Sequence, residues 1–154
     1  MGKIVVKMRI RNLFDEVRAK SGIIKEDGIR ELTIDNALVD TGATMLSLPT
    51  NLIEKLGLEE AGTREVRTAN GTVTRRVFRE VLVEIQGRDG AFDVLELPID
   101  VAPLIGQIVL EQLDLYPDLQ NQRLTGRPDA PDHMVVECYL YLKENFDKNA
   151  KSVI

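Results

Sequence analysis

Short β-prone runs separated by turn signals fill the middle of this sequence and restrict its fold more than any other feature. Two such runs occupy residues 64–85 and are separated by Asn70-Gly71, the dipeptide best suited to the positive φ angles of a tight hairpin turn. Alternating apolar residues then lead to a second turn predicted at residues 87–90. Residues 92–97 continue as a strand in which the alternation of apolar residues shifts by one position. The sequence therefore predicts two consecutive β-hairpins.

The flanking segments add further strands and only short helices. Residues 4–10 and 32–39 are rich in strand formers. A short amphipathic helix that a glycine ends is predicted over residues 50–56, a second short helix is predicted over residues 108–113, and residues 12–22 fit either a short helix or a loop. Many short strands with few brief helices predict a mostly antiparallel β-barrel or sandwich.

Length and composition favour one globular domain and disfavour several partners. The 154 residues suffice for one domain with a real core, and 44% hydrophobic and 29% charged residues are ordinary globular values. A net charge of -5 gives no electrostatic reason to expect nucleic acid or an anionic membrane as a partner. The apolar run at residues 4–6 is too short for a signal peptide or a membrane span, so a cytoplasmic location is expected.

The residue types that bind metals are scarce in this sequence. Cys138 is the only cysteine and His133 the only histidine. Two isolated groups cannot make a closed zinc site or a Cys-His nucleophile. Glu59-Glu60 follows a helix end and is interpreted as solvated surface. We expect no metal and no cofactor.

The strongest candidate for chemistry is Asp40, which follows an apolar strand and precedes Thr41 and Gly42. The strand delivers a carboxylate into a tight turn, and the glycine permits close approach of the backbone. Two carboxylates that share one proton can activate a water and protonate a leaving amine. The chain has only one such Asp-Thr-Gly motif. Taken alone, the tripeptide is more often a structural turn in which Asp caps a backbone amide.

The order of the segments resembles that of retroviral-type aspartic proteases, and the resemblance covers residues 32–124. Residues 38–43 resemble the active-site strand and loop of that family, and the first predicted hairpin resembles its flap. Residues 81–87 are similar to the strand after the flap, and residues 104–106 resemble the apolar pair and glycine that pack behind the catalytic loop. Residues 118–124 resemble a segment of compact bacterial members of this retropepsin-like clan.

This resemblance implies both a fold and an activity. The fold would be a single-domain closed β-barrel with a flap hairpin and one or two short helices. The activity would be that of an endopeptidase that acts on peptide or protein substrates as a homodimer, with Asp40 from each chain flanking a bound water. Thr41 would brace the two loops across the dimer, Gly42 would let backbone groups approach the carboxylates, and Ala43 would supply one hydrogen-bond donor fewer than the Ser or Thr of pepsin-like enzymes. The implied site residues are Asp40, Thr41, Gly42 and Ala43 in the loop, Ala69, Asn70 and Gly71 in the flap, and Leu104, Ile105 and Gly106 behind the loop.

The sequence departs from the viral pattern at two places. Thr44-Met45 stands where the viral enzymes carry acidic residues, and Gln107 stands where they carry arginine. The ion pair that usually supports the dimer is therefore absent. Since both partners are missing together, no buried charge is stranded.

The carboxyl-terminal part of the chain is predicted to lie outside the main domain. A protease domain is expected over residues 1–126, followed over residues 127–154 by a proline-containing linker and a strand or tail that is a candidate for the dimer interface. The β-prone segment 135–142 would supply the interchain strand.

Two other functions fit parts of the sequence. A non-catalytic peptide-binding or dimerisation module with the same fold fits the missing ion pair. Residues 40–44 also match the Asp-x-Gly-x-Thr phosphate loop of actin-like ATPases and sugar kinases. That fold needs two α/β lobes of more than twice this length, and the sequence has no second phosphate motif.

Overall fold

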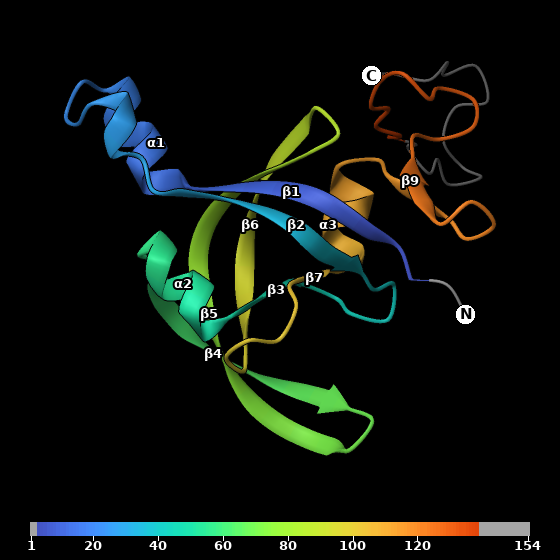
Figure 1. The fold of residues 1–154 in the computed structure, drawn as a ribbon, viewed down its shortest axis with the longest axis horizontal. Helices are drawn as coiled ribbons and strands as arrows, with labels where there is room; N and C mark the ends of the chain where they lie inside the picture. Colours follow the sequence, from blue (N-terminus) through green and yellow to red (C-terminus); the bar gives the residue numbers. More distant parts are fainter. Residues whose placement is uncertain (1–2, 139–154) are drawn as a thin grey trace, which may run out of the picture.

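A computed structural model describes residues 3–138 of the chain. Nine strands, three α-helices and one 3-10 helix make up this part of the molecule (Figure 1). In chain order they are β1 (Val5–Asn12), α1 (Leu13–Lys20), η1 (Glu26–Gly28), β2 (Glu31–Val39), β3 (Leu46–Pro49), α2 (Thr50–Leu56), β4 (Glu59–Thr68), β5 (Gly71–Ile85), β6 (Arg88–Leu97), β7 (Leu104–Ile105), α3 (Gln107–Gln112), β8 (Tyr116–Asp118) and β9 (Arg123–Thr125).

Seven strands form one sheet in the order β1-β2-β7-β3-β6-β5-β4, and an additional β1–β5 pairing bends it into a ring. The prediction of a mostly β fold is confirmed, but the ring is not the closed barrel that was expected. The reason is the shortness of β7, which pairs with β2 through two residues and with β3 through the single pair Ser47↔Leu104. The structure has three α-helices where one or two were expected. The additional helix is α1, in the segment 12–22 whose sequence fitted either a helix or a loop.

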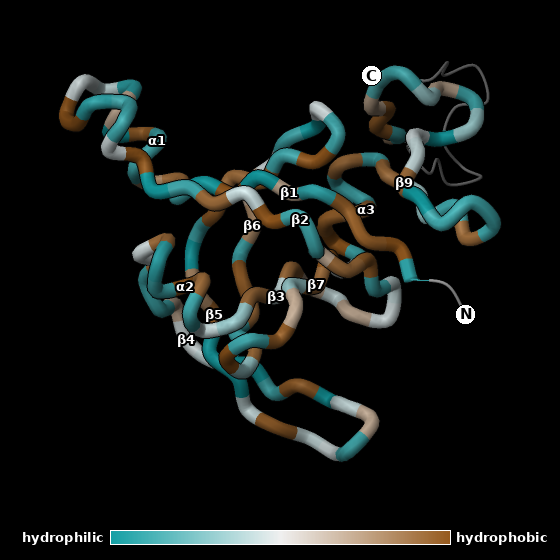
Figure 2. Tube along the Cα trace, viewed as in Figure 1, coloured by the Kyte–Doolittle hydropathy of each residue, from teal (hydrophilic) through white to brown (hydrophobic). Residues whose placement is uncertain are grey.

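The ring encloses the hydrophobic core. Hydrophobic residues recur along its strands (Figure 2), as expected where alternate side chains of each strand face inward. The fully buried large side chains are Met8, Ile10, Leu46, Leu48, Ile53, Leu56, Val77, Val81, Val83, Ile85, Ile105 and Leu113. β3 and β7 contribute to this core. The loop between β2 and β3 and the segment that follows β7 are therefore each attached to a buried strand.

The first predicted hairpin is present and consists of β4 and β5. Its turn differs in detail from the prediction, since Thr68 pairs with Gly71 and the turn residues are Ala69 and Asn70. Only Gly71 has a positive φ, of 115°, whereas the prediction gave positive φ angles to both Asn70 and Gly71. The Thr68 hydroxyl stabilises the turn by accepting a hydrogen bond from Asn70 N at 3.2 Å and donating one to Gly71 O at 2.7 Å.

The second hairpin, formed by β5 and β6, turns two residues earlier than predicted. Ile85 pairs with Arg88, so the turn consists of Gln86 and Gly87, and residues 88–90 belong to β6. Gln86 and Gly87 have φ angles of 52° and 78°, the pair of positive values that a tight two-residue hairpin requires. The predicted turn at residues 87–90 was therefore wrong in position, because a glutamine adopts the left-handed conformation.

Helix α1 projects from the ring and is tied to it by two buried polar residues. The Asn12 side chain caps the helix by accepting from Asp15 N at 3.1 Å and also donates to Leu56 O at 2.8 Å. Two hydrogen bonds from the Arg30 guanidinium, at 2.8 and 3.0 Å, hold the pKa of the Asp15 carboxyl below its usual value. Together these contacts join α1, α2 and the start of β2.

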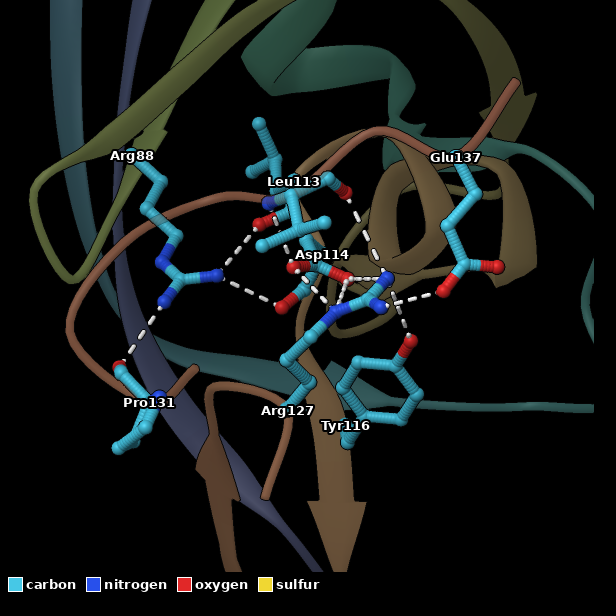
Figure 3. Close-up of polar contacts among 8 residues, drawn as sticks. Arg88, Leu113, Asp114, Tyr116, Arg127, Pro131 and Glu137 are labelled. Carbon is cyan, nitrogen blue, oxygen red and sulfur yellow. Dashed lines mark hydrogen bonds and ion pairs between the residues drawn. The ribbon is translucent and has the colours of Figure 1, made fainter. Parts of the chain in front are cut away.

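A cluster of hydrogen bonds holds residues 127–137 against the ring (Figure 3). The Arg127 guanidinium donates to both oxygens of buried Asp114 at 2.9–3.2 Å and to Glu137 at 2.7 Å. Asp114 also accepts from Val135 N at 3.0 Å. These donors, Arg127 first, lower the pKa of the Asp114 carboxyl to about 2, and the carboxylates that accept from Arg127, Asp114 first and then Glu137, raise the pKa of the guanidinium. Arg88 adds hydrogen bonds from β6 to the backbone of the same region.

The predicted carboxyl-terminal strand is only partly covered by the structure. Residues 135–138 carry no regular secondary structure, and residues 139–142 lie outside the described residues. A domain boundary at residue 126 stays a prediction. Within residues 3–138, no helix is long and apolar enough to cross a membrane.

Candidate active site

Asp40 lies immediately after β2, at the start of a tight loop. Its backbone N–H donates to Ile105 O at 3.0 Å, and its carbonyl accepts from Ala43 N at 3.1 Å. The carboxylate is half-buried, and its Oδ1 accepts a hydrogen bond from Gly42 N at 2.9 Å. This is the capping contact of a structural turn, yet Oδ2 has no protein partner within residues 3–138. The turn thus fixes the carboxylate and leaves one oxygen available.

Residues 104–108 pack directly behind this loop. β7 runs parallel to the end of β2, and beyond it Gln107 N donates to Ala43 O at 2.8 Å and Ile108 N to Thr44 O at 3.0 Å. A Cβ atom at Gly106 would lie 2.5 Å from Met45 O and 2.8 Å from Ala43 O. Glycine is therefore required where this segment meets the loop. The structure brings together the loop and the segment 104–106 that the sequence had placed behind it.

The side chains beside Asp40 differ in their surroundings. Thr41 is exposed, and its hydroxyl has no partner in the described part of the chain, whereas Ala43 is half-buried. The Gln107 side chain donates to Glu111 Oε1 at 3.1 Å within α3 and so does not reach the loop. Thr44 meets the same segment through its backbone carbonyl alone. No ion pair bridges the loop and α3 in residues 3–138, as the sequence departures predict.

A cleft of about 1100 Å³ runs along the loop. Its lining comes from Asp40 and residues 42–47, from residues 64–69 of the β4–β5 hairpin, and from parts of β6 and α3. The hairpin extends from the ring on the side of the loop (Figure 1). Of the three predicted flap residues, Ala69 lines the cleft, while Asn70 and Gly71 stand outside its lining. One chain therefore provides a carboxylate, a cleft and a hairpin beside it.

Sequence reasoning missed several residues of the cleft. Glu80 and Asp93 line it from β5 and β6, and Met45 and Val66 add apolar surface. The pairing of β5 with β6 is irregular between Phe78 and Val81, so Glu80 sits in a bulge. The only sequence signal for this bulge was a break in the alternation of apolar and polar residues just before it, where the adjacent residues 77 and 78 are both apolar.

The described residues do not gather metal ligands. Within residues 3–138, no group of three or more His, Cys, Asp and Glu side chains is placed to hold a metal ion. What the loop can supply is one carboxylate oxygen in a sheltered cleft, which suits proton transfer to or from a bound water.

Comparison with known families points to the same elements. The model of a family described as aspartyl protease matches residues 27–114, which is more than half of the chain and includes the loop, the hairpin and residues 104–106. A search of curated proteins found no match.

Proposed function

The chain belongs to the aspartyl protease family, and we propose that it is an aspartic endopeptidase that cleaves peptide bonds as a homodimer. The observation that carries the proposal is the half-buried Asp40 carboxylate, which has one uncommitted oxygen in the cleft and is fixed by hydrogen bonds within its loop. Acid-base peptide hydrolysis without a metal needs two such carboxylates that share one proton. Each chain has one Asp-Thr-Gly motif, so two chains complete the site.

The proposed reaction follows from the chemistry of the paired carboxylates. A water bound between the two Asp40 side chains loses a proton to the ionised carboxylate as its oxygen attacks the carbonyl carbon of the substrate. The protonated carboxyl group donates a hydrogen bond to the carbonyl oxygen as that oxygen gains charge. The carboxyl group that took the proton from the water then gives it to the leaving amine nitrogen as the carbon–nitrogen bond breaks, and the pair again shares one proton.

The surroundings of Asp40 support this pairing. The exposed Thr41 hydroxyl is free within the described residues to hydrogen-bond to the second chain and brace the two loops. The backbone hydrogen bonds from residues 107 and 108 keep each loop rigid, so little reorganisation is needed during reaction. Because the usual ion pair is missing, the contacts between the two chains would come from the loop, the hairpin and other surfaces.

The cleft suits an extended peptide. β4 pairs only with β5 in the sheet of the described chain, so its other edge presents free backbone groups beside the cleft. An extended peptide can add to such an edge through main-chain hydrogen bonds, with side-chain pockets supplying specificity. The apolar lining from residues such as Met45, Val66 and Leu95 would receive apolar substrate side chains.

The test is digestion of a peptide library by the wild-type protein and by Asp40→Asn, with Asp35→Asn as the matched control because Asp35 is exposed on β2 and outside the cleft lining. We expect Asp40→Asn to abolish cleavage while keeping the wild-type melting temperature and sedimentation coefficient, and Asp35→Asn to retain both fold and cleavage. Cleavage by Asp40→Asn, or an active monomer, would refute the proposal. Peptide binding without cleavage by the wild type would instead favour the non-catalytic module.

A further inference from the structure

The cleft contains a second carboxylate, Glu80, that the proposed chemistry does not use. Glu80 lies on β5 and lines the same cavity as Asp40, and Asp93, which faces it on β6, also lines this cavity. It is half-buried, and its side chain makes no hydrogen bond or ion pair within residues 3–138. Because this carboxylate lines the cleft and is paired with no cation of the described residues, it is a candidate for ligand recognition.

The backbone explains how Glu80 reaches the cleft. Phe78 pairs with Val94 and Val81 pairs with Phe92, so Arg79 and Glu80 together face the single residue Asp93. This is a β-bulge, in which an extra residue re-aims the side chains of one strand. Without the bulge, Glu80 and Val81 would exchange faces, and the valine would leave the core. The bulge thus keeps the core intact and turns a carboxylate towards the cleft.

The charges around Glu80 leave it without a neutralising partner. Arg79, its neighbour in the bulge, contacts Asp93 with Nε to Oδ2 at 3.4 Å, and the Arg79 side chain is exposed whereas that of Asp93 is half-buried. Arg64 and Arg67 line the cleft from the β4–β5 hairpin, but both are exposed, so water and salt screen them. No described cation therefore pairs with the Glu80 carboxylate in the wall of the cleft.

We propose that Glu80 is a specificity-determining residue that selects peptides with a lysine or arginine side chain at the position that reaches Glu80 in the cleft. The inference rests on the proposed function, because it takes the ligand to be a peptide substrate. Phe92 and Ile108 line the same cleft as Glu80, so the aliphatic stem of a long basic side chain can lie on apolar surface while its charged end meets the carboxylate. A hydrogen-bonded ion pair of this kind adds discrimination more than raw affinity.

The test measures peptide binding without cleavage. Fluorescein-labelled octapeptide libraries carry either lysine or norleucine at one scanned position, and fluorescence anisotropy measures their binding to the full chain with the substitution Asp40→Asn. We expect lysine to be preferred at one position by about fivefold. Adding Glu80→Gln should remove this preference. Adding Glu84→Gln should retain it, because Glu84 lies on the same strand outside the cleft lining and faces Arg9 at 3.8 Å.

A charge reversal gives a second, independent result. Glu80→Lys should make a glutamate library bind more tightly than the matching glutamine library, and circular dichroism checks that each variant is folded. Equal binding of the lysine and norleucine libraries at every position, or a lysine preference that survives Glu80→Gln, would overturn the inference. Because binding is measured apart from turnover, a protein that prefers lysine but cleaves nothing would refute the proposed function and leave the role of Glu80 standing.

Discussion

Replacing Gly106 with alanine tests how the active-site loop is held in place. The glycine has φ −88° and ψ −178°, which alanine adopts without strain, so any effect must be steric. The new Cβ would lie 2.5 Å from Met45 O, 2.8 Å from Ala43 O and 2.8 Å from the carbonyl carbon of Thr44. All three atoms belong to loop backbone and cannot rotate away as a side chain could.

The expected cost follows from these contacts. Restoring ordinary contact distances requires the loop or β7 to move by about 0.6–0.9 Å, and an overpacked site of this kind typically costs about 1–3 kcal/mol. The shift also stretches the hydrogen bonds to Ala43 O and Thr44 O, at 2.8 and 3.0 Å, each worth about 1 kcal/mol. We expect Gly106→Ala to lower the free energy of unfolding by about 2–4 kcal/mol and to reduce kcat/KM more than any loss of folded protein explains.

Urea unfolding followed by circular dichroism measures the stability, and peptide cleavage measures the activity. Gly28→Ala is the matched control, because its nearest contact, Ile24 Cδ1, would lie at an ordinary 3.7 Å and its φ is not in the left-handed region. The control should change stability by less than about 0.5 kcal/mol. If Gly106→Ala behaves like the control in both assays, the close approach of Gly106 to the loop backbone does not hold the loop in place.

Three further substitutions probe other parts of the structure. Asn12→Ala removes the α1 cap and the buried hydrogen bond to the end of α2, so the free energy of unfolding measured in urea should fall by about 2–3 kcal/mol; a loss below about 0.5 kcal/mol would contradict this. Gly71→Ala forces alanine to φ 115°, so we expect slower peptide cleavage with little change in melting temperature, and unchanged kcat/KM would show that the turn geometry is not needed. Asp114 has a folded-state pKa of about 2, lowered from 3.8, so its contribution is complete above about pH 4 and is lost as the pH falls towards 2. The melting temperature of Asp114→Asn should therefore lie below that of the wild type at pH 6, with a gap that narrows below pH 4; a gap independent of pH would refute the role of the Asp114–Arg127 pair.

The sequence was most informative where local chemistry decides the structure. The apolar strand before Asp40, the glycine that ends α2 and the hairpin around residue 70 all depend on neighbouring residues, and the structure has each of them. The family-like order of segments also placed residues 104–106 near the loop. The resemblance to aspartic proteases is confirmed by the family match over residues 27–114.

Features that depend on distant residues could not be predicted in the same way. The strand β3 is four residues long and pairs in parallel with β6, about fifty positions away, so no local pattern reveals it. The turn at Gln86 needs a non-glycine residue with positive φ, which residue preferences disfavour. The Arg127–Asp114 contact joins residues that only the tertiary fold brings together, so the sequence around Arg127 indicated only a proline-containing linker. The Glu80 bulge likewise depends on the register of β5 against β6.

The central claim is that catalysis needs two Asp40 carboxylates, one from each chain, and a mixing experiment tests it most directly. Wild-type and Asp40→Asn chains are combined in urea at fixed total concentration, refolded together so that the subunits assort at random, and assayed for peptide cleavage. If both carboxylates are required, activity follows the square of the wild-type fraction and an equal mixture retains about one quarter of full activity. Activity that falls in direct proportion to the wild-type fraction, leaving about one half in an equal mixture, would show that each chain acts alone and would contradict the account.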